Sequence, residues 1–214
     1  MKVFRNLELE GGKSALLQVI EDIEKRLEAG WAREHEKERK IATDAPDAMY
    51  CFSCSDDKER ETAELWLAHR GENALYVANI IPDRARQLTI DQYNAIAEEF
   101  YEKYARPAAE ALGLNHLLTP SVKEIEDWVS EETAAKLRRF SRLANKQTGS
   151  THFLDEQRWL DFLVSAHAEV STLDSGTLIR WLVENEGWPE DIAYNLAVEY
   201  EFARSLLAFY DEHK

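Results

Sequence analysis

The residues best suited to binding chemistry lie between positions 136 and 158, where cations and hydroxyl groups gather in an acidic chain. Donors of this kind beside the start of a helix can hold an anion or an acidic partner. Some of them lie on a predicted helix and the others in the segment that follows it. The candidate binding residues are Lys136, Arg139, Arg142, Lys146, Thr148, Ser150, His152 and Arg158.

The four candidates nearest the N-terminus predict a basic stripe on the helix expected at residues 131–145. At about 100° per residue, Leu137, Phe140 and Ala144 mark the buried face, and the stripe lies on the opposite side. It is the clearest basic feature of the chain.

The segment after this helix also has structural roles. Gly149 allows a turn, Asp155 is predicted to cap the next helix, and Leu154 is placed to pack on Trp159. The remaining polar groups either form a binding site or pair with surrounding acids and link the two halves of the protein. We favour pairing, because buried polar groups need partners in either case.

Other motifs are incomplete. Gly-Gly-Lys-Ser at residues 11–14 lacks the earlier glycine of a Walker loop, since Leu7 takes its place, and a strand-to-helix turn explains it. Cys51 and Cys54 end a predicted strand, which is a context for redox pairs. The aspartates that follow disfavour a thiolate there, so we predict two inert, buried thiols.

No metal or cofactor is expected. The six histidines lack close ligand spacing, the two cysteines cannot supply four zinc ligands, and HExxH is absent. Gly-x-Ser-x-Gly is absent as well. The sequence identifies no catalytic residue. Catalysis by carboxylates that are distant in the sequence and come together only in the folded protein is left as an alternative.

Composition narrows the class of partner. The 214 residues carry 26 Lys and Arg against 41 Asp and Glu, a formal net charge of −15, and both halves are acidic. Such a surface repels nucleic-acid backbones and anionic lipid. Its acidity either attracts basic proteins or serves solubility alone, and of these two explanations we favour solubility. The chain has no apolar run of about 20 residues and no signal-peptide core near its start. We expect a cytoplasmic protein without direct nucleic-acid or membrane binding.

The N-terminal part alternates strand and helix patterns. Strands are predicted at residues 1–10, 48–54 and 74–81. The helices between and after them run from Leu16 into the charged stretch 33–40, over 57–70, and from a Thr89 capping box to Gly113. After Pro120, helical patterns follow at 122–129, 131–145, 155–169, 175–186 and 189–211.

These patterns predict the α+β (mixed α/β) class. A small three-stranded β-α-β-α-β-α domain over residues 1–120 would pack on an all-helical domain over 121–214.

Charge and motifs together favour a non-catalytic binding protein whose acidic surface meets a basic protein partner. Toxin-immunity proteins, antitoxins and nucleic-acid mimics share this acidity, and the likeness is one of charge alone. One alternative is an enzyme that acts on a phosphate-bearing or other anionic substrate through residues 146–158. A second is a structural subunit of a larger assembly, and a homodimer is a further alternative.

Overall fold

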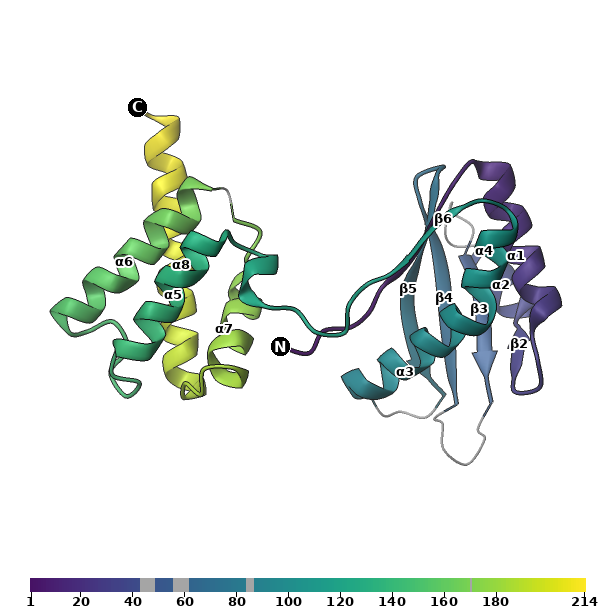
Figure 1. Ribbon diagram of the computed structural model, residues 1–214, viewed down its shortest axis with the longest axis horizontal. Helices are drawn as coiled ribbons and strands as arrows, with labels where there is room; N and C mark the ends of the chain where they lie inside the picture. The colour runs from purple at the N-terminus through teal and green to yellow at the C-terminus, as the bar shows by residue number, and fades with distance from the viewer. Residues whose placement is uncertain (43–48, 56–61, 84–86, 170) are drawn as a thin grey trace. The chain divides into compact units, whose positions relative to one another are not determined.

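The computed structural model describes residues 1–42, 49–55, 62–83, 87–169 and 171–214 and divides the chain into two compact units. One unit contains Lys2–Ser121, and the other contains Val122–Lys214 together with Met1. The first combines a β-sheet with helices and the second is built from helices (Figure 1). The predicted α+β class is therefore confirmed.

The sheet of the first unit has six antiparallel strands in the order β2-β3-β4-β5-β1-β6. The prediction of a three-stranded β-α-β-α-β-α unit is wrong. Two of the missed strands lie at the sheet edges and have only three and four residues, too few to show a clear alternation. The strands are β1 (Leu7–Glu10), β2 (Trp31–Arg33), β3 (Met49–Cys54), β4 (Ala63–Arg70), β5 (Ala74–Pro82) and β6 (Asn115–Leu118).

The prediction of a helix over residues 57–70 is also wrong. Residues 57–61 lie outside the described part of the chain, and β4 pairs with β3 on one side and β5 on the other. Its side chains are buried on both faces of the sheet, so the polar alternation of a half-exposed strand is missing. Gly71, at φ 65°, lies in the turn between β4 and β5 and does not end a helix.

Helix α1 (Lys13–Arg26) follows β1 through a glycine turn, with Gly12 as its N-cap. A side chain at Gly11 would meet Leu114 Cδ2 at 2.1 Å, so close packing accounts for that glycine. The expectation that this helix continues through residues 33–40 is wrong. It ends at Arg26, and a separate helix, α2 (His35–Ala42), follows β2.

The third helical region is continuous and matches its prediction. It consists of α3 (Ile90–Phe100), the π-helix η1 (Tyr101–Ala105) and α4 (Arg106–Ala111). The predicted capping box is present: the Thr89 side chain accepts from the Gln92 backbone, and the Gln92 side chain accepts from the Thr89 backbone.

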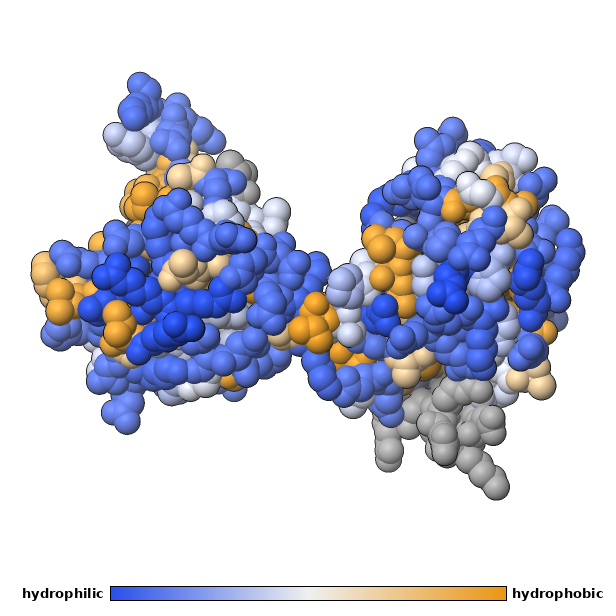
Figure 2. Space-filling view, viewed as in Figure 1, coloured by the Kyte–Doolittle hydropathy of each residue, from blue (hydrophilic) through white to orange (hydrophobic). Residues whose placement is uncertain are grey.

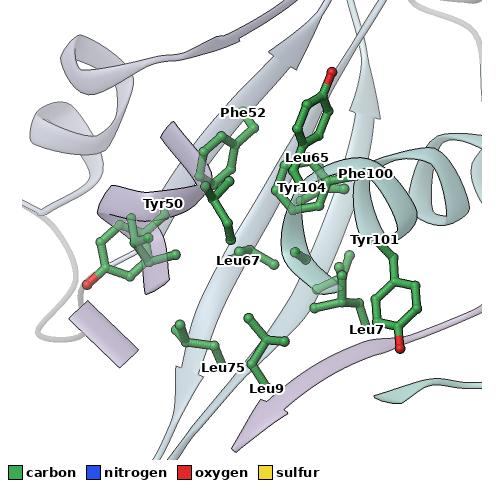
Figure 3. Close-up of a cluster of buried hydrophobic side chains, with 14 of the residues drawn as sticks. Leu7, Leu9, Tyr50, Phe52, Leu65, Leu67, Leu75, Phe100, Tyr101 and Tyr104 are labelled. Atoms are coloured by element: carbon green, nitrogen blue, oxygen red, sulfur yellow. The ribbon is translucent and has the colours of Figure 1, made fainter. Parts of the chain in front are cut away.

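The core of this unit lies between one face of the sheet and the helices α1, α3 and α4 (Figures 1 and 3). Leucines from neighbouring strands meet Phe100 and Tyr104 there, and Phe52 packs on Phe100 with ring centres 4.9 Å apart. The strand residues in this cluster include Leu7, Leu9, Phe52, Leu65, Leu67 and Leu75.

Arg33 connects three elements of this unit through charge. Its guanidinium forms ion pairs with Glu24 of α1 at 2.7 Å and with Glu38 of α2 at 2.9 Å. Burial acts to lower the pKa of Arg33, but the bonds from these two carboxylates outweigh it and raise the pKa. The arginine therefore stays charged and fastens α1 and α2 to β2.

Cys51 and Cys54 are both buried, and no disulfide joins them. They are three residues apart on β3, so they point to opposite faces of the sheet, with Cα atoms separated by about 10 Å. A disulfide needs a Cα separation below about 7 Å. Burial and the carboxylate of Glu64 raise the pKa of Cys51 to about 12.

Among the described residues, the second unit contains the 3-10 helix η2 and four α-helices, and the four α-helices lie within two residues of their predicted bounds at each end. The prediction over 122–129 is wrong in extent, because only Ile125–Asp127 forms a turn of helix. The α-helices are α5 (Glu131–Leu143), α6 (Phe153–Ala168), α7 (Ser175–Glu184) and α8 (Glu190–Glu212). No helix in the described residues is long and apolar enough to cross a membrane.

Aromatic side chains fill the centre of the helical unit. Phe140 of α5 lies 4.9 Å from Trp159 of α6 and 5.4 Å from Trp188, measured between ring centres. The buried Ser141 hydroxyl accepts from Trp188 Nε1 at 2.8 Å and donates to Glu186 at 2.7 Å. These contacts bind the turn before α8 to α5.

We expect Cys51 and Cys54 to react slowly with a thiol reagent at neutral pH, because both residues are buried and the raised pKa of Cys51 also disfavours its thiolate. Labelling of the native protein would be compared with labelling in denaturant, where both should react fully. Fast native labelling with reversible disulfide formation would restore the redox interpretation.

A pH-dependent contribution to stability is expected from Glu126 of η2. The hydrogen bond from Arg138 of α5 lowers its pKa below the ordinary 4.5, so the pair stabilises the fold above that pH and loses its effect as pH falls through the folded value. Glu126→Gln should lower the free energy of unfolding at pH 7 by up to about 1 kcal/mol. Denaturant titrations at several pH values should show this difference shrinking in acid, whereas the exposed control Glu156→Gln should show none.

Candidate protein-binding surface

Lys136 lies on α5 among polar groups of α6. Its amine donates to Ser165 Oγ at 3.0 Å and forms an ion pair with Glu132 at 2.9 Å. The hydrogen bond from Lys136 lowers the pKa of Glu132, so this carboxylate is ionised at neutral pH. Lys136 is therefore already paired within the unit.

Arg139 and Arg142 are the accessible part of the predicted stripe. Both are exposed on α5, and neither forms an ion pair or a hydrogen bond through its side chain to another described residue. The side chain of Thr148 is exposed in the same way. These three groups are free to contact a partner.

Lys146 does not continue the stripe, and the prediction that it does is wrong. Helix α5 ends at Leu143, and Ala144 is already extended with ψ 149°. Lys146 instead donates to the backbone carbonyl of Glu186 and lies 5.9 Å from the ring centre of Trp188.

Ser150 and His152 serve neighbouring helices. The Ser150 hydroxyl donates to Glu199 of α8 at 2.8 Å. His152 is the N-cap of α6, and its Nδ1 accepts from the Leu154 backbone at 3.4 Å. The prediction that Asp155 is the cap is therefore wrong. Leu154 is 48% exposed, and its packing on Trp159 stays a prediction.

Arg158 holds a buried carboxylate. Its Nη1 donates to Asp155 Oδ1 at 2.6 Å, and the Asp155 side chain is only 8% exposed. Asp155 also accepts from the Asn145 backbone at 3.4 Å. The pair therefore fastens the start of α6 to the end of α5.

The eight candidates do not converge on one position for an anion. Lys136, Lys146, Ser150 and Arg158 each have a polar partner. Those partners belong to the helical unit, so these contacts do not link the two halves of the chain. Binding at the remaining accessible residues stays a prediction.

A groove of about 530 Å³ between α5 and α6 does bring charged groups together. We call it the α5–α6 groove. Its charged lining consists of three carboxylates and one lysine, and half-exposed Leu160 and Val164 supply an apolar part. The charged residues are Glu132, Lys136, Asp161 and Glu169.

Hydrogen bonds hold the floor of this groove. The buried Thr133 hydroxyl lies 2.8 Å from Ser165 Oγ and 3.0 Å from Glu169, and Glu169 also accepts from the Ser130 backbone at 3.0 Å. Glu169 is therefore a fixed structural group. Asp161 is exposed and forms no ion pair among the described residues, whereas the exposed Glu132 is already paired with Lys136.

The groove is suited to accepting a cation. Paired carboxylates beside apolar surface fit a lysine or arginine, whose charged head needs acceptors while its stem packs on apolar atoms. Among the described residues, no three His, Cys, Asp or Glu side chains lie close enough to hold a metal ion. The arrangement favours recognition of a basic side chain.

A second surface that the sequence analysis missed lies on α8. Apolar (orange) atoms interrupt the mostly hydrophilic surface of the helical unit (Figure 2). The exposed apolar residues of α8 are Tyr194, Val198, Phe202, Leu206, Phe209 and Tyr210, which we call the α8 strip. Five of them, all but Phe209, recur every four residues in the sequence. A second apolar stripe through the buried Leu196 and Tyr200 is enough to explain the helix, so the sequence gives no reason to single out the exposed one.

No protein-family model matches this chain, and neither a curated protein nor a solved structure shows significant similarity to it.

Arg158→Ala should destabilise the helical unit by about 3 kcal/mol, because it leaves the buried Asp155 carboxylate without its ion-pair partner. Arg142→Ala is the matched control and should change the free energy of unfolding by less than about 0.5 kcal/mol, since the side chain is exposed. Chemical denaturation of both variants would measure these differences. Equal stability of the two would show that the Arg158 pair contributes little.

Proposed function

We propose that the chain is a non-catalytic binding protein that presents the acidic α5–α6 groove to a basic protein partner, in the cytoplasm as the sequence predicts. The observation that carries this proposal is the groove itself, in which accessible carboxylates lie beside exposed apolar side chains.

The charge of the helical unit supports the proposal. Residues 122–214 contain eighteen Asp and Glu against ten Lys and Arg, a formal charge of −8. Several of those cations are engaged internally: Arg138 with Glu126, Lys136 with Glu132, and Arg158 with Asp155. Because these cations are paired within the unit, the excess carboxylates lack a cationic partner. Their negative charge attracts a basic protein and raises its rate of association.

The groove also suggests how such a partner would be held. A lysine or arginine entering it would meet Asp161 and would share Glu132 with Lys136, while its stem would lie along Leu160 and Val164. Both carboxylates are exposed, so they gain a partner without leaving a buried charge behind. This mode of binding suits an inhibitor of a basic protein, such as an immunity protein, an antitoxin or a nucleic-acid mimic.

An enzyme acting on an anionic substrate through residues 146–158 is the weaker alternative. Such an enzyme needs cations that converge on one point. Lys146 instead binds a backbone carbonyl and Arg158 binds Asp155, in different parts of the turn.

The proposal is tested by affinity capture with the full chain, comparing Glu132→Gln/Asp161→Asn with the control Glu201→Gln/Glu212→Gln. The control removes the same charge from exposed positions of α8 that form no ion pair among the described residues. A captured basic protein should bind the groove variant about tenfold more weakly and the control almost normally. Its complex with the wild-type chain should weaken with added salt.

Two results would count against this function. One is capture of no basic protein under low-salt conditions. The other is turnover of a phosphorylated substrate that is abolished by Thr148→Ala, a change at an exposed residue of this segment, while the fold stays intact. That result would favour the enzyme alternative.

A further inference from the structure

The α8 strip is a large unpartnered apolar surface. Its six side chains are between 53% and 67% exposed. Four of them are aromatic. Exposing an aromatic ring to water is unfavourable in free energy, and aromatic residues are common at the centres of protein interfaces. Scattered apolar residues are normal on a surface, but six on one helix form a continuous patch.

The strip faces away from the bundle. At about 100° per residue, Tyr194, Val198, Phe202 and Leu206 lie on the side opposite the buried residues Leu196 and Tyr200. Because the strip and the buried face are on opposite sides, packing within the unit does not cover it.

The C-terminal half of α8 depends on few internal contacts. None of the residues Glu201–Glu212 is buried. Its contacts with the unit include a hydrogen bond from Arg204 to the Leu173 carbonyl at 3.3 Å and an ion pair between Asp211 and His167 at 2.8 Å. An isolated helix of about 12 residues has only marginal stability in water unless it packs on other apolar residues. A partner on this strip would therefore stabilise the segment.

Five of the six strip residues follow a symmetric order, and Phe209 lies outside it. Phe202 is at the centre, aliphatic Val198 and Leu206 lie four residues to either side, and Tyr194 and Tyr210 lie eight residues away. A two-fold axis through Phe202 would place each phenylalanine against its equivalent, Val198 against Leu206, and Tyr194 facing Tyr210. An interface between identical chains requires this self-complementarity.

We propose that a second copy of this chain covers the α8 strip in a symmetric, antiparallel dimer centred on Phe202. The area agrees with this occupant. At about 150–250 Å² for each aromatic side chain, the strip offers roughly 600 Å² per copy and about 1,200 Å² in total, the lower end for a specific interface. This self-association does not rest on the proposed function, because it uses a different helix.

The dimer responds to salt in the opposite direction to a complex with a basic partner. Each copy carries a net charge of −15, and Glu201 lies next to the axis residue. Added salt screens the repulsion between copies and should strengthen the dimer, while it weakens a complex with a basic protein. The two associations can therefore be separated in one titration.

Sedimentation equilibrium of the full chain tests the proposal. The wild-type chain should dimerise at micromolar concentrations, with tighter association in high salt. Phe202→Glu should raise the dissociation constant at least tenfold, and circular dichroism should show that it stays folded, since this side chain is exposed. The control Leu160→Glu changes an exposed apolar residue of α6 and should leave the dimer intact.

Cysteine cross-linking tests the axis independently of any folding defect. Phe202→Cys should form a disulfide-linked dimer on mild oxidation, and a mixture of Val198→Cys and Leu206→Cys chains should cross-link faster than either variant alone. Leu160→Cys should form no disulfide-linked dimer. A wild-type chain that stays monomeric at 100 micromolar, about a hundredfold above the expected range, would overturn the proposal, and so would cross-linking of Leu160→Cys as rapid as that of Phe202→Cys.

Discussion

Ion pairing of scarce cations is the constraint on which both units depend. Arg33 fastens α1 and α2 to β2, Arg138 fastens η2 to α5, and Arg158 holds the carboxylate that joins α5 to α6. A guanidinium that loses water on folding needs carboxylates in return. Because 26 cations face 41 carboxylates, these structural pairs leave a large acidic surplus. The α5–α6 groove is acidic because many of the scarce cations form ion pairs at other positions.

The helical unit therefore combines two surfaces with different physics. The α5–α6 groove offers charge with a small apolar part, and binding there would depend on Coulomb attraction. The α8 strip offers apolar area with carboxylates beside it, and binding there would depend on the hydrophobic effect against charge repulsion. A small acidic protein can use both at once, because self-association through α8 leaves the groove on α5 and α6 accessible within its own unit. Such a dimer would present two acidic grooves to one partner, which increases avidity if their spacing fits.

Local patterns predicted the α-helices of the helical unit and, in the sheet, the strands β1, β3 and β5. The helices α5, α6, α7 and α8 were predictable because each has a regular apolar spacing and a clear end, such as Gly187 before α8. The capping box at Thr89 was predictable for the same reason. Strand β4 was not, since its burial on both faces follows from pairing with β3 and β5, which no local window contains. At the candidate site, the residue types were predictable and their partners were not.

The sequence by itself determined the net charge, the positions of the long helices and the lack of any complete metal or nucleophile motif, because these follow from composition and near-neighbour spacing. The tertiary structure decided the rest. In the folded chain, α5 ends at Leu143 and Lys146 donates to the backbone carbonyl of Glu186. Cys51 and Cys54 lie on opposite faces of β3, and one apolar face of α8 is exposed. A helix with two apolar faces can bury either one within its own unit. Only the packing of α6 and α7 against α8 selects the face that remains for a partner, since that choice depends on contacts far apart in the chain.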